Sequence, residues 1–125
     1  MTLELPKVSG VVMTAEGRLT DGMLSVTFAG TADSETRDQL DEFVKQVQTE
    51  ALRLKVPQVI VDFRELEFMN SSCFKIFVAW LAQLRDLTAD TQYRIQIRSN
   101  PNLLWQRRSL AALSCFAIDL VTIQT

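Results

Sequence analysis

The sequence predicts one α/β domain spanning residues 1–125, with a mixed, mostly parallel sheet of about five strands and helices packed against it, in the order β-β-α-β-α-β-α-β. Two observations predict this class. Short β-branched or alternating segments take turns with longer segments of helical apolar spacing, which favours parallel strands joined by right-handed crossovers. A chain of 125 residues that is 47% hydrophobic is also long enough to bury one core.

The first two strands are expected over residues 8–14 and 24–28. The first segment is rich in β-branched residues, and the second alternates apolar and polar side chains with period two. Turn signals at Gly17 and at residues 20–22 separate them. The pattern indicates an antiparallel pair with one covered face.

A helix and a central strand come next. Beyond Gly30, apolar side chains recur at helical spacing as far as Leu54, and Asp33 is expected to cap this helix. Residues 59–61 form a continuous apolar run, which is typical of a central strand covered on both faces.

The second half of the chain predicts two more helices and two more strands. Residues 70–87 have caps at their start and a wide apolar arc, so this helix is deeply buried or offers part of its surface to a partner. Residues 93–98 alternate as a strand with one wet face. A helix is expected to start at Asn100 and Pro101, and residues 118–123 are expected to form the last strand.

Composition excludes several classes of function. The chain has no histidine, which removes Ser-His-Asp and Cys-His nucleophile activation and His-containing zinc sites. A net charge of −2 and a pI of about 5.1 argue against a nucleic-acid partner. The sequence shows no signal peptide and no apolar run long enough to insert in a membrane. Cys73 and Cys115 are expected to be reduced thiols, which indicates a cytoplasmic protein.

Ser71 and Ser72 can serve two purposes at the start of a helix. Their hydroxyls can cap free backbone N–H groups. One of them can instead carry a phosphoryl group, whose charge of about −1.5 to −2 would lie against the helix dipole and the unsatisfied donors.

Residues 59–63 and the following run Leu66-Glu67-Phe68-Met69-Asn70-Ser71-Ser72-Cys73-Phe74 resemble the core motif of STAS domains, the anti-sigma-factor antagonist family. The family pattern is an apolar strand ending in Asp, a short loop, and Asp-Ser-Ser/Thr-Gly-Leu opening a helix. The similarity in element order extends from about Val8 to Ile123. It implies that a partner kinase of the anti-sigma type phosphorylates Ser71, with Ser72 the less favoured residue.

Three residues depart from this pattern: Asn70 replaces Asp, Cys73 replaces Gly and Phe74 replaces Leu. Asn70 keeps an acceptor for the loop but removes a negative charge beside the hydroxyl. Cys73 is either a small packed side chain or a thiol whose pKa the helix start lowers. The resemblance implies a partner-binding loop and helix composed of Asp62, Met69, Asn70, Ser72, Cys73, Phe74 and Lys75.

From the residues alone, Asp62 can equally be a carboxylate that holds its own loop. Arg94, Arg98, Arg107 and Arg108 could suggest a phosphate site, but solvated faces explain them as well.

The sequence therefore predicts a non-enzymatic protein-binding module, switched by phosphorylation, that needs no cofactor and no metal. Its expected partners are a kinase of the anti-sigma type or another signalling enzyme, and a phosphatase. The alternative is a constitutive STAS scaffold subunit of a transporter or a larger signalling complex, in which the serines act only as helix caps. An enzyme ranks third, because a serine or cysteine nucleophile would lack an evident base.

Overall fold

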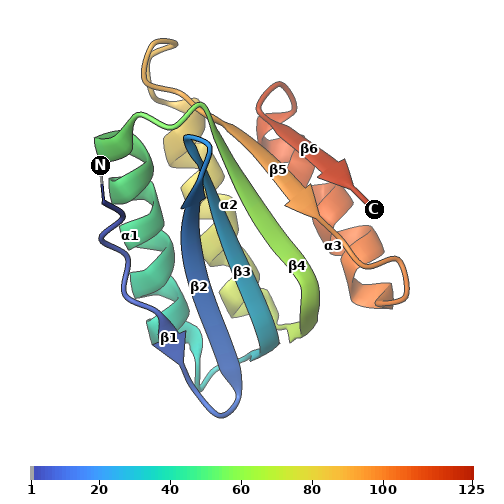
Figure 1. The fold of residues 1–125 in the computed structure, drawn as a ribbon. Helices are drawn as coiled ribbons and strands as arrows, with labels where there is room; N and C mark the ends of the chain where they lie inside the picture. Colours follow the sequence, from blue (N-terminus) through green and yellow to red (C-terminus); the bar gives the residue numbers. More distant parts are fainter. Residues whose placement is uncertain (1) are drawn as a thin grey trace.

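The computed structural model describes residues 2–125 and contains one six-stranded sheet with three helices (Figure 1). The strands lie side by side in chain order: β1 (Val8–Ser9), β2 (Met13–Thr20), β3 (Met23–Ala32), β4 (Gln58–Met69), β5 (Arg94–Arg98) and β6 (Val121–Gln124). β1, β2 and β3 pair antiparallel, whereas β3 to β6 pair parallel. The predicted mixed, mostly parallel α/β class is confirmed, with six strands rather than five.

The three helices are α1 (Arg37–Leu54), α2 (Ser71–Arg85) and α3 (Leu104–Ser114), and a short 3₁₀ helix (Cys115–Ala117) follows α3. Each helix connects two neighbouring parallel strands, so crossovers of the same hand place all three on one face of the sheet (Figure 1). All three begin at the carboxyl ends of the strands. Within residues 2–125, no helix combines the length and apolar character needed to cross a membrane.

Strand boundaries differ from the prediction at both ends of the chain. The expected strand over residues 8–14 is two strands, because the chain bends between Ser9 and Met13. Gly17 is not a turn residue: it lies inside β2, where a Cβ atom would come within 2.4 Å of the Leu5 side chain. The last strand begins at Val121 rather than at residue 118, because the 3₁₀ helix extends the preceding turn.

Helix starts also differ from the prediction. Thr36 occupies the N-cap position of α1, and the Asp33 carboxylate instead accepts hydrogen bonds from the N–H groups of Glu35 and Thr36 in the turn before the helix. α3 starts at Leu104, because Asn100 folds back to accept a hydrogen bond from the Asn102 N–H.

The core lies between the sheet and the helices. Four phenylalanines, Phe28, Phe43, Phe63 and Phe77, come from β3, α1, β4 and α2, with ring centroids 5.2–5.6 Å apart. Each is 2% exposed or less, and complete burial of such a ring contributes about 1.5–3 kcal/mol. In the described part of the chain, no helix covers the other face of the sheet (Figure 1). The prediction that the central strand is covered on both faces is therefore wrong: Ile60 points to this open face and is half-buried.

β4 is longer than its neighbour β5, and α3 compensates for the difference. The last β4–β5 pair joins Asp62 to Arg98, but β4 continues to Met69. Beyond that pair, Gln106 Nε2 donates to the carbonyl oxygens of Phe63 at 2.7 Å and Leu66 at 3.2 Å. Its Oε1 accepts from the Asn100 N–H at 2.7 Å. The side-chain amide of Gln106 therefore supplies hydrogen bonds to β4 that a neighbouring strand would otherwise supply.

We predict that Gln106→Ala lowers the free energy of unfolding by about 2–4 kcal/mol, because it removes three hydrogen bonds and leaves the Phe63 carbonyl and the Asn100 N–H without their partner. Trp105 still donates to the Leu66 carbonyl. Gln106 is 2% exposed. Urea unfolding followed by circular dichroism measures the change. The exposed Gln83 on α2 provides the control: Gln83→Ala should stay within about 0.5 kcal/mol of the wild type. Equal effects of the two variants would contradict the bracing role.

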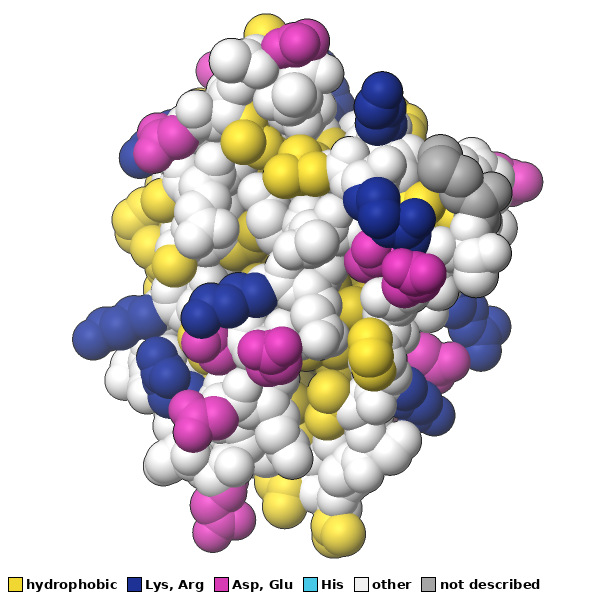
Figure 2. Space-filling model, turned by 90° about the vertical axis from the view of Figure 1, so that its left-hand side faces the viewer, with side chains coloured by type: hydrophobic (Ala, Val, Ile, Leu, Met, Phe, Trp, Pro, Cys, Tyr) yellow, Lys and Arg dark blue, Asp and Glu magenta, His cyan; other side chains and the backbone are white. Residues whose placement is uncertain are grey.

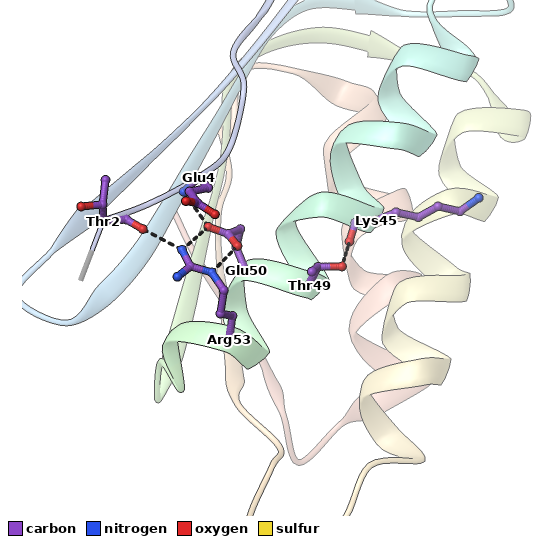
Figure 3. Close-up of polar contacts among 6 residues, drawn as sticks. All are labelled: Thr2, Glu4, Lys45, Thr49, Glu50 and Arg53. Carbon is purple, nitrogen blue, oxygen red and sulfur yellow. Dashed lines mark hydrogen bonds and ion pairs between the residues drawn. The ribbon is translucent and has the colours of Figure 1, made fainter.

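A buried glutamate ties the N-terminal segment to the end of α1 (Figure 3). The Glu50 carboxylate accepts two hydrogen bonds of 2.7 Å from the Arg53 guanidinium and one of 2.6 Å from the Glu4 N–H. Arg53 Nη2 also donates to the Thr2 carbonyl at 2.6 Å. The hydrogen bonds from Arg53 hold the pKa of Glu50 below its usual value, against the opposing effect of burial.

Glu50 should therefore make stability depend on pH. Since its pKa is lower in the folded chain than in the unfolded one, its contribution is present above pH 4.5 and is lost as the pH falls below that value. Glu50→Gln should cost about 1–3 kcal/mol at neutral pH, and the difference from the wild type should shrink toward about pH 3. Urea unfolding at both pH values tests this, with the exposed Glu42→Gln on the same helix as control. A pH-independent difference would contradict it.

Candidate functional site

The turn from β4 into α2 is held by a single residue, Asn70. Its N–H donates to the Ala32 carbonyl at 2.9 Å, which continues the pairing of β4 with β3. Its Oδ1 accepts from the Cys73 N–H at 2.9 Å, and its carbonyl accepts from the Phe74 N–H at 3.0 Å. With extended backbone angles, Asn70 is the N-cap of α2. These bonds fix the position of the next residue, Ser71.

The two serines are the first residues of α2, and neither acts as its cap. Ser71 is exposed and Ser72 is half-buried. Within residues 2–125, neither hydroxyl makes a hydrogen bond, and the N–H groups of both residues lack an acceptor. The sequence allowed the serines to cap the helix, but the structure gives that role to Asn70. Ser71 therefore presents a free hydroxyl beside two free backbone donors.

The start of α2 carries no negative side chain of its own, and the nearby β3–α1 segment contributes one acid, Asp33, and one base, Arg37. The first turn of α2 has no acidic side chain, and Lys75, one turn further along, is exposed as expected for a partner contact. The positive end of the helix dipole lies at the same place. The site can therefore accommodate an added anion without direct repulsion from α2.

Two residues predicted to contact a partner are buried instead. Cys73 is 0% exposed and its thiol donates to the Asp33 carbonyl at 3.4 Å, while Met69 is 8% exposed. Burial raises the pKa of the Cys73 thiol, and Arg37 only partly opposes this effect. The hypothesis of a low-pKa thiol is therefore wrong. Phe74 is partly buried against the core and contributes only part of its ring to the surface.

Asp62 does not lie beside the serines. It is in the middle of β4, seven residues before the strand ends at Met69, which corresponds to about 23 Å of strand. Its carboxylate accepts from Arg64 at the backbone N–H, Nε and Nη2, with distances of 2.8–3.0 Å. Burial raises the pKa of Asp62, but these hydrogen bonds outweigh it and the pKa is lowered. The structure therefore places Asp62 within β4 and outside the turn that carries the serines, and the interpretation of Asp62 as a carboxylate that holds its own segment is confirmed.

Two exposed hydrophobic residues near Ser71 were not predicted. Phe68, at the end of β4, is 48% exposed, and Val11, in the β1–β2 turn, is fully exposed. The turn is joined to this edge by a 2.9 Å hydrogen bond from the Thr31 N–H to the Val12 carbonyl. Hydrophobic side chains protrude at this end in the view over α1 (Figure 2). We call Ser71, Phe68, Val11 and Lys75 together the serine surface.

Irregular pairing brings Phe68 to the surface. The β3–β4 register shifts twice, so β4 has extra residues opposite the segments between Thr27 and Ala29 and between Gly30 and Thr31. Gly30 has φ +93°, and a Cβ atom there would meet the Val12 carbonyl oxygen at 2.1 Å. Such shifts break the simple alternation of the strand, which is why sequence periodicity did not place Phe68 outside.

The fold matches known structures of one functional group. An anti-sigma factor antagonist from Mycobacterium paratuberculosis superimposes with a TM-score of 0.64 at 20% identity, covering 86% of each chain. The anti-sigma factor antagonist SpoIIAA in its unphosphorylated form gives a TM-score of 0.58 at 17% identity, covering 89% of this chain and 88% of that one. No family model and no curated protein matches the sequence. The chain has the STAS fold of these antagonists, so the fold-level resemblance seen in the sequence is confirmed.

The two cysteines should differ sharply in reactivity. Cys115 is exposed and Cys73 is buried with a raised pKa. In the Cys115→Ser variant, a disulfide reagent at neutral pH should modify the remaining thiol roughly a hundredfold more slowly than in denaturant. The Cys73→Ser variant should react rapidly while folded. Fast labelling of folded Cys115→Ser would contradict the packing role of Cys73.

Proposed function

We propose that this chain is a non-enzymatic, protein-binding regulator of the anti-sigma-factor antagonist kind, switched by phosphorylation of Ser71. The observation that carries the proposal is the free, exposed Ser71 hydroxyl at the start of α2, on a fold shared with anti-sigma factor antagonists. One of these neighbours is described in its unphosphorylated form, which supports a phosphorylated counterpart in that protein.

The site is suited to receive a phosphoryl group. A partner kinase can reach the Ser71 hydroxyl without unfolding the helix, because Asn70 rather than Ser71 caps it. The phosphate added to Ser71 Oγ would lie near free N–H groups and the positive end of the helix dipole. The modification is therefore compatible with the folded chain, and its main effect falls on whatever binds there.

The serine surface explains why phosphorylation would weaken binding. Phe68 precedes Ser71 by three residues, and Val11 lies in the turn that is hydrogen-bonded to Thr31, the β3 partner of Phe68. Both offer apolar area for burial by a partner. A partner that buries this area accepts a neutral hydroxyl but would have to desolvate a phosphate carrying about −1.5 to −2 charges. Such desolvation costs several kcal/mol unless cations compensate.

The proposed partners follow from this chemistry. A kinase of the anti-sigma type, or another signalling enzyme, binds the unmodified serine surface and modifies it, and a phosphatase removes the phosphate. The chain itself supplies the hydroxyl and needs no cofactor. We place this exchange in the cytoplasm, where both free cysteines would stay reduced.

Ser71→Glu should weaken capture of the partner by about tenfold or more, because it places a charge in the apolar contact. Ser71→Ala should bind at least as well as the wild type and carry no phosphate. The matched control is Gln83→Glu, which adds a charge to the same helix about 18 Å away. Affinity capture from the native cytosol, with quantitative mass spectrometry and site-resolved phosphopeptide analysis, measures binding and modification together.

Equal capture by Ser71→Glu and the wild type, with no phosphate on Ser71, would overturn the switch and favour a constitutive scaffold. Phosphate on Ser72 instead of Ser71 would move the switch by one residue, which a Ser72→Ala variant would confirm. Loss of capture by Gln83→Glu would show that the effect is not local to the serine surface.

A further inference from the structure

The outer edge of β6 offers unpaired backbone groups. In the parallel ladder with β5, the carbonyls of Leu120 and Gln124 accept from the N–H groups of Ile95 and Ser99, at 2.7 and 2.8 Å. Because a strand directs alternate residues to opposite edges, Val121 and Ile123 point their N–H and C=O groups away from β5. Within residues 2–125, no strand pairs with this edge.

The two edges of the sheet differ in how they are protected. β1 is only two residues long and follows Pro6 and Lys7, which discourage further strand addition. β6 has the sequence Val-Thr-Ile-Gln, with no charge, no proline and no register shift. It has none of the usual features that prevent another strand from pairing.

A groove borders this edge on the helix-covered side of the sheet. It has a volume of about 440 Å³ and lies between β6, the β5–α3 loop and α3. Its walls include Pro101, Leu110, Ala111 and Ile123, and the Ile123 side chain is 37% exposed. A strand added to β6 would direct every second side chain into this groove.

Positive charge surrounds the groove and the edge. Residues 93–125 contain four arginines and one aspartate, a net charge of +3, whereas residues 1–92 carry −5. Arg107 lines the groove, and Arg98 is paired with Gln124 of β6 and lies on the open face. Neither arginine forms an ion pair within residues 2–125. On the α1 side, by contrast, acidic and basic side chains are interspersed (Figure 2).

We propose that the β6 edge binds an extended, acidic segment of a partner protein as a seventh strand. Its backbone would pair with Val121 and Ile123, its alternate apolar side chains would enter the groove, and the carboxylates between them would point to the open face and meet Arg98.

A fluorescein-labelled peptide that alternates glutamate with valine over nine residues is the probe, measured by fluorescence anisotropy. The full chain should bind it saturably, and the same peptide with lysine in place of glutamate should bind at least about tenfold more weakly. Ile123→Pro should abolish binding, since it removes an outward N–H while the β5–β6 hydrogen bonds remain. Ile123→Val keeps the N–H and an apolar side chain, and should bind like the wild type.

Hydrogen exchange of the wild type provides a second measurement that does not depend on the folding of a variant. The peptide should slow exchange of the Val121 and Ile123 amides. Unchanged exchange there, equal binding of the lysine peptide, or full binding by Ile123→Pro would each overturn the proposal. If the chain dimerises in a concentration-dependent way and Ile123→Pro abolishes the dimer, the occupant of the β6 edge is a second copy of this chain and the proposal of an acidic segment is overturned. Ser71→Glu should leave peptide affinity unchanged, so this test and the phosphorylation test can fail separately.

Discussion

The structure depends on how the second half of β4 is kept extended after its neighbour β5 ends. A strand with unpaired carbonyls in the interior would be costly. Three side chains remove that cost: Gln106 bonds the Phe63 and Leu66 carbonyls, Asn100 bonds the Arg64 carbonyl at 3.2 Å, and Trp105 bonds the Leu66 carbonyl at 3.2 Å. The start of α3 thus holds the strand that carries the serine surface.

This bracing links two distant parts of the sequence to one function. Met69 and Asn70 follow directly from the braced part of β4, and Asn70 is bonded to Ala32 of β3. Ser71 therefore stands on a backbone fixed from both sides, as a binding site on a rigid element requires. Motion at the start of α3 would therefore change the position of the serine surface by way of β4. No residue of α3 is adjacent to Ser71 in the sequence or hydrogen-bonded to it.

The class of fold could be predicted because the periodicity of apolar residues reports which positions are buried. The buried positions predicted in this way are correct for α1, β3 and most of α2. The exposure of Phe68 and the length of β4 could not, since they arise from register shifts and from side-chain hydrogen bonds made by Gln106, 40 residues or more away. The motif located Ser71, but sequence spacing alone could not show that Cys73 and Met69 face the core or that Asp62 binds Arg64.

Asn70 gives the proposed switch a specific electrostatic character. An aspartate at this position would cap the helix equally well but would place a negative charge next to the phosphorylated hydroxyl. The amide keeps the 2.9 Å cap bond to the Cys73 N–H and leaves the helix start uncharged. The phosphate would then be repelled less than it would be beside an acidic cap. The departure from the family motif thus preserves the geometry of the site and lowers the electrostatic cost of placing a phosphate there.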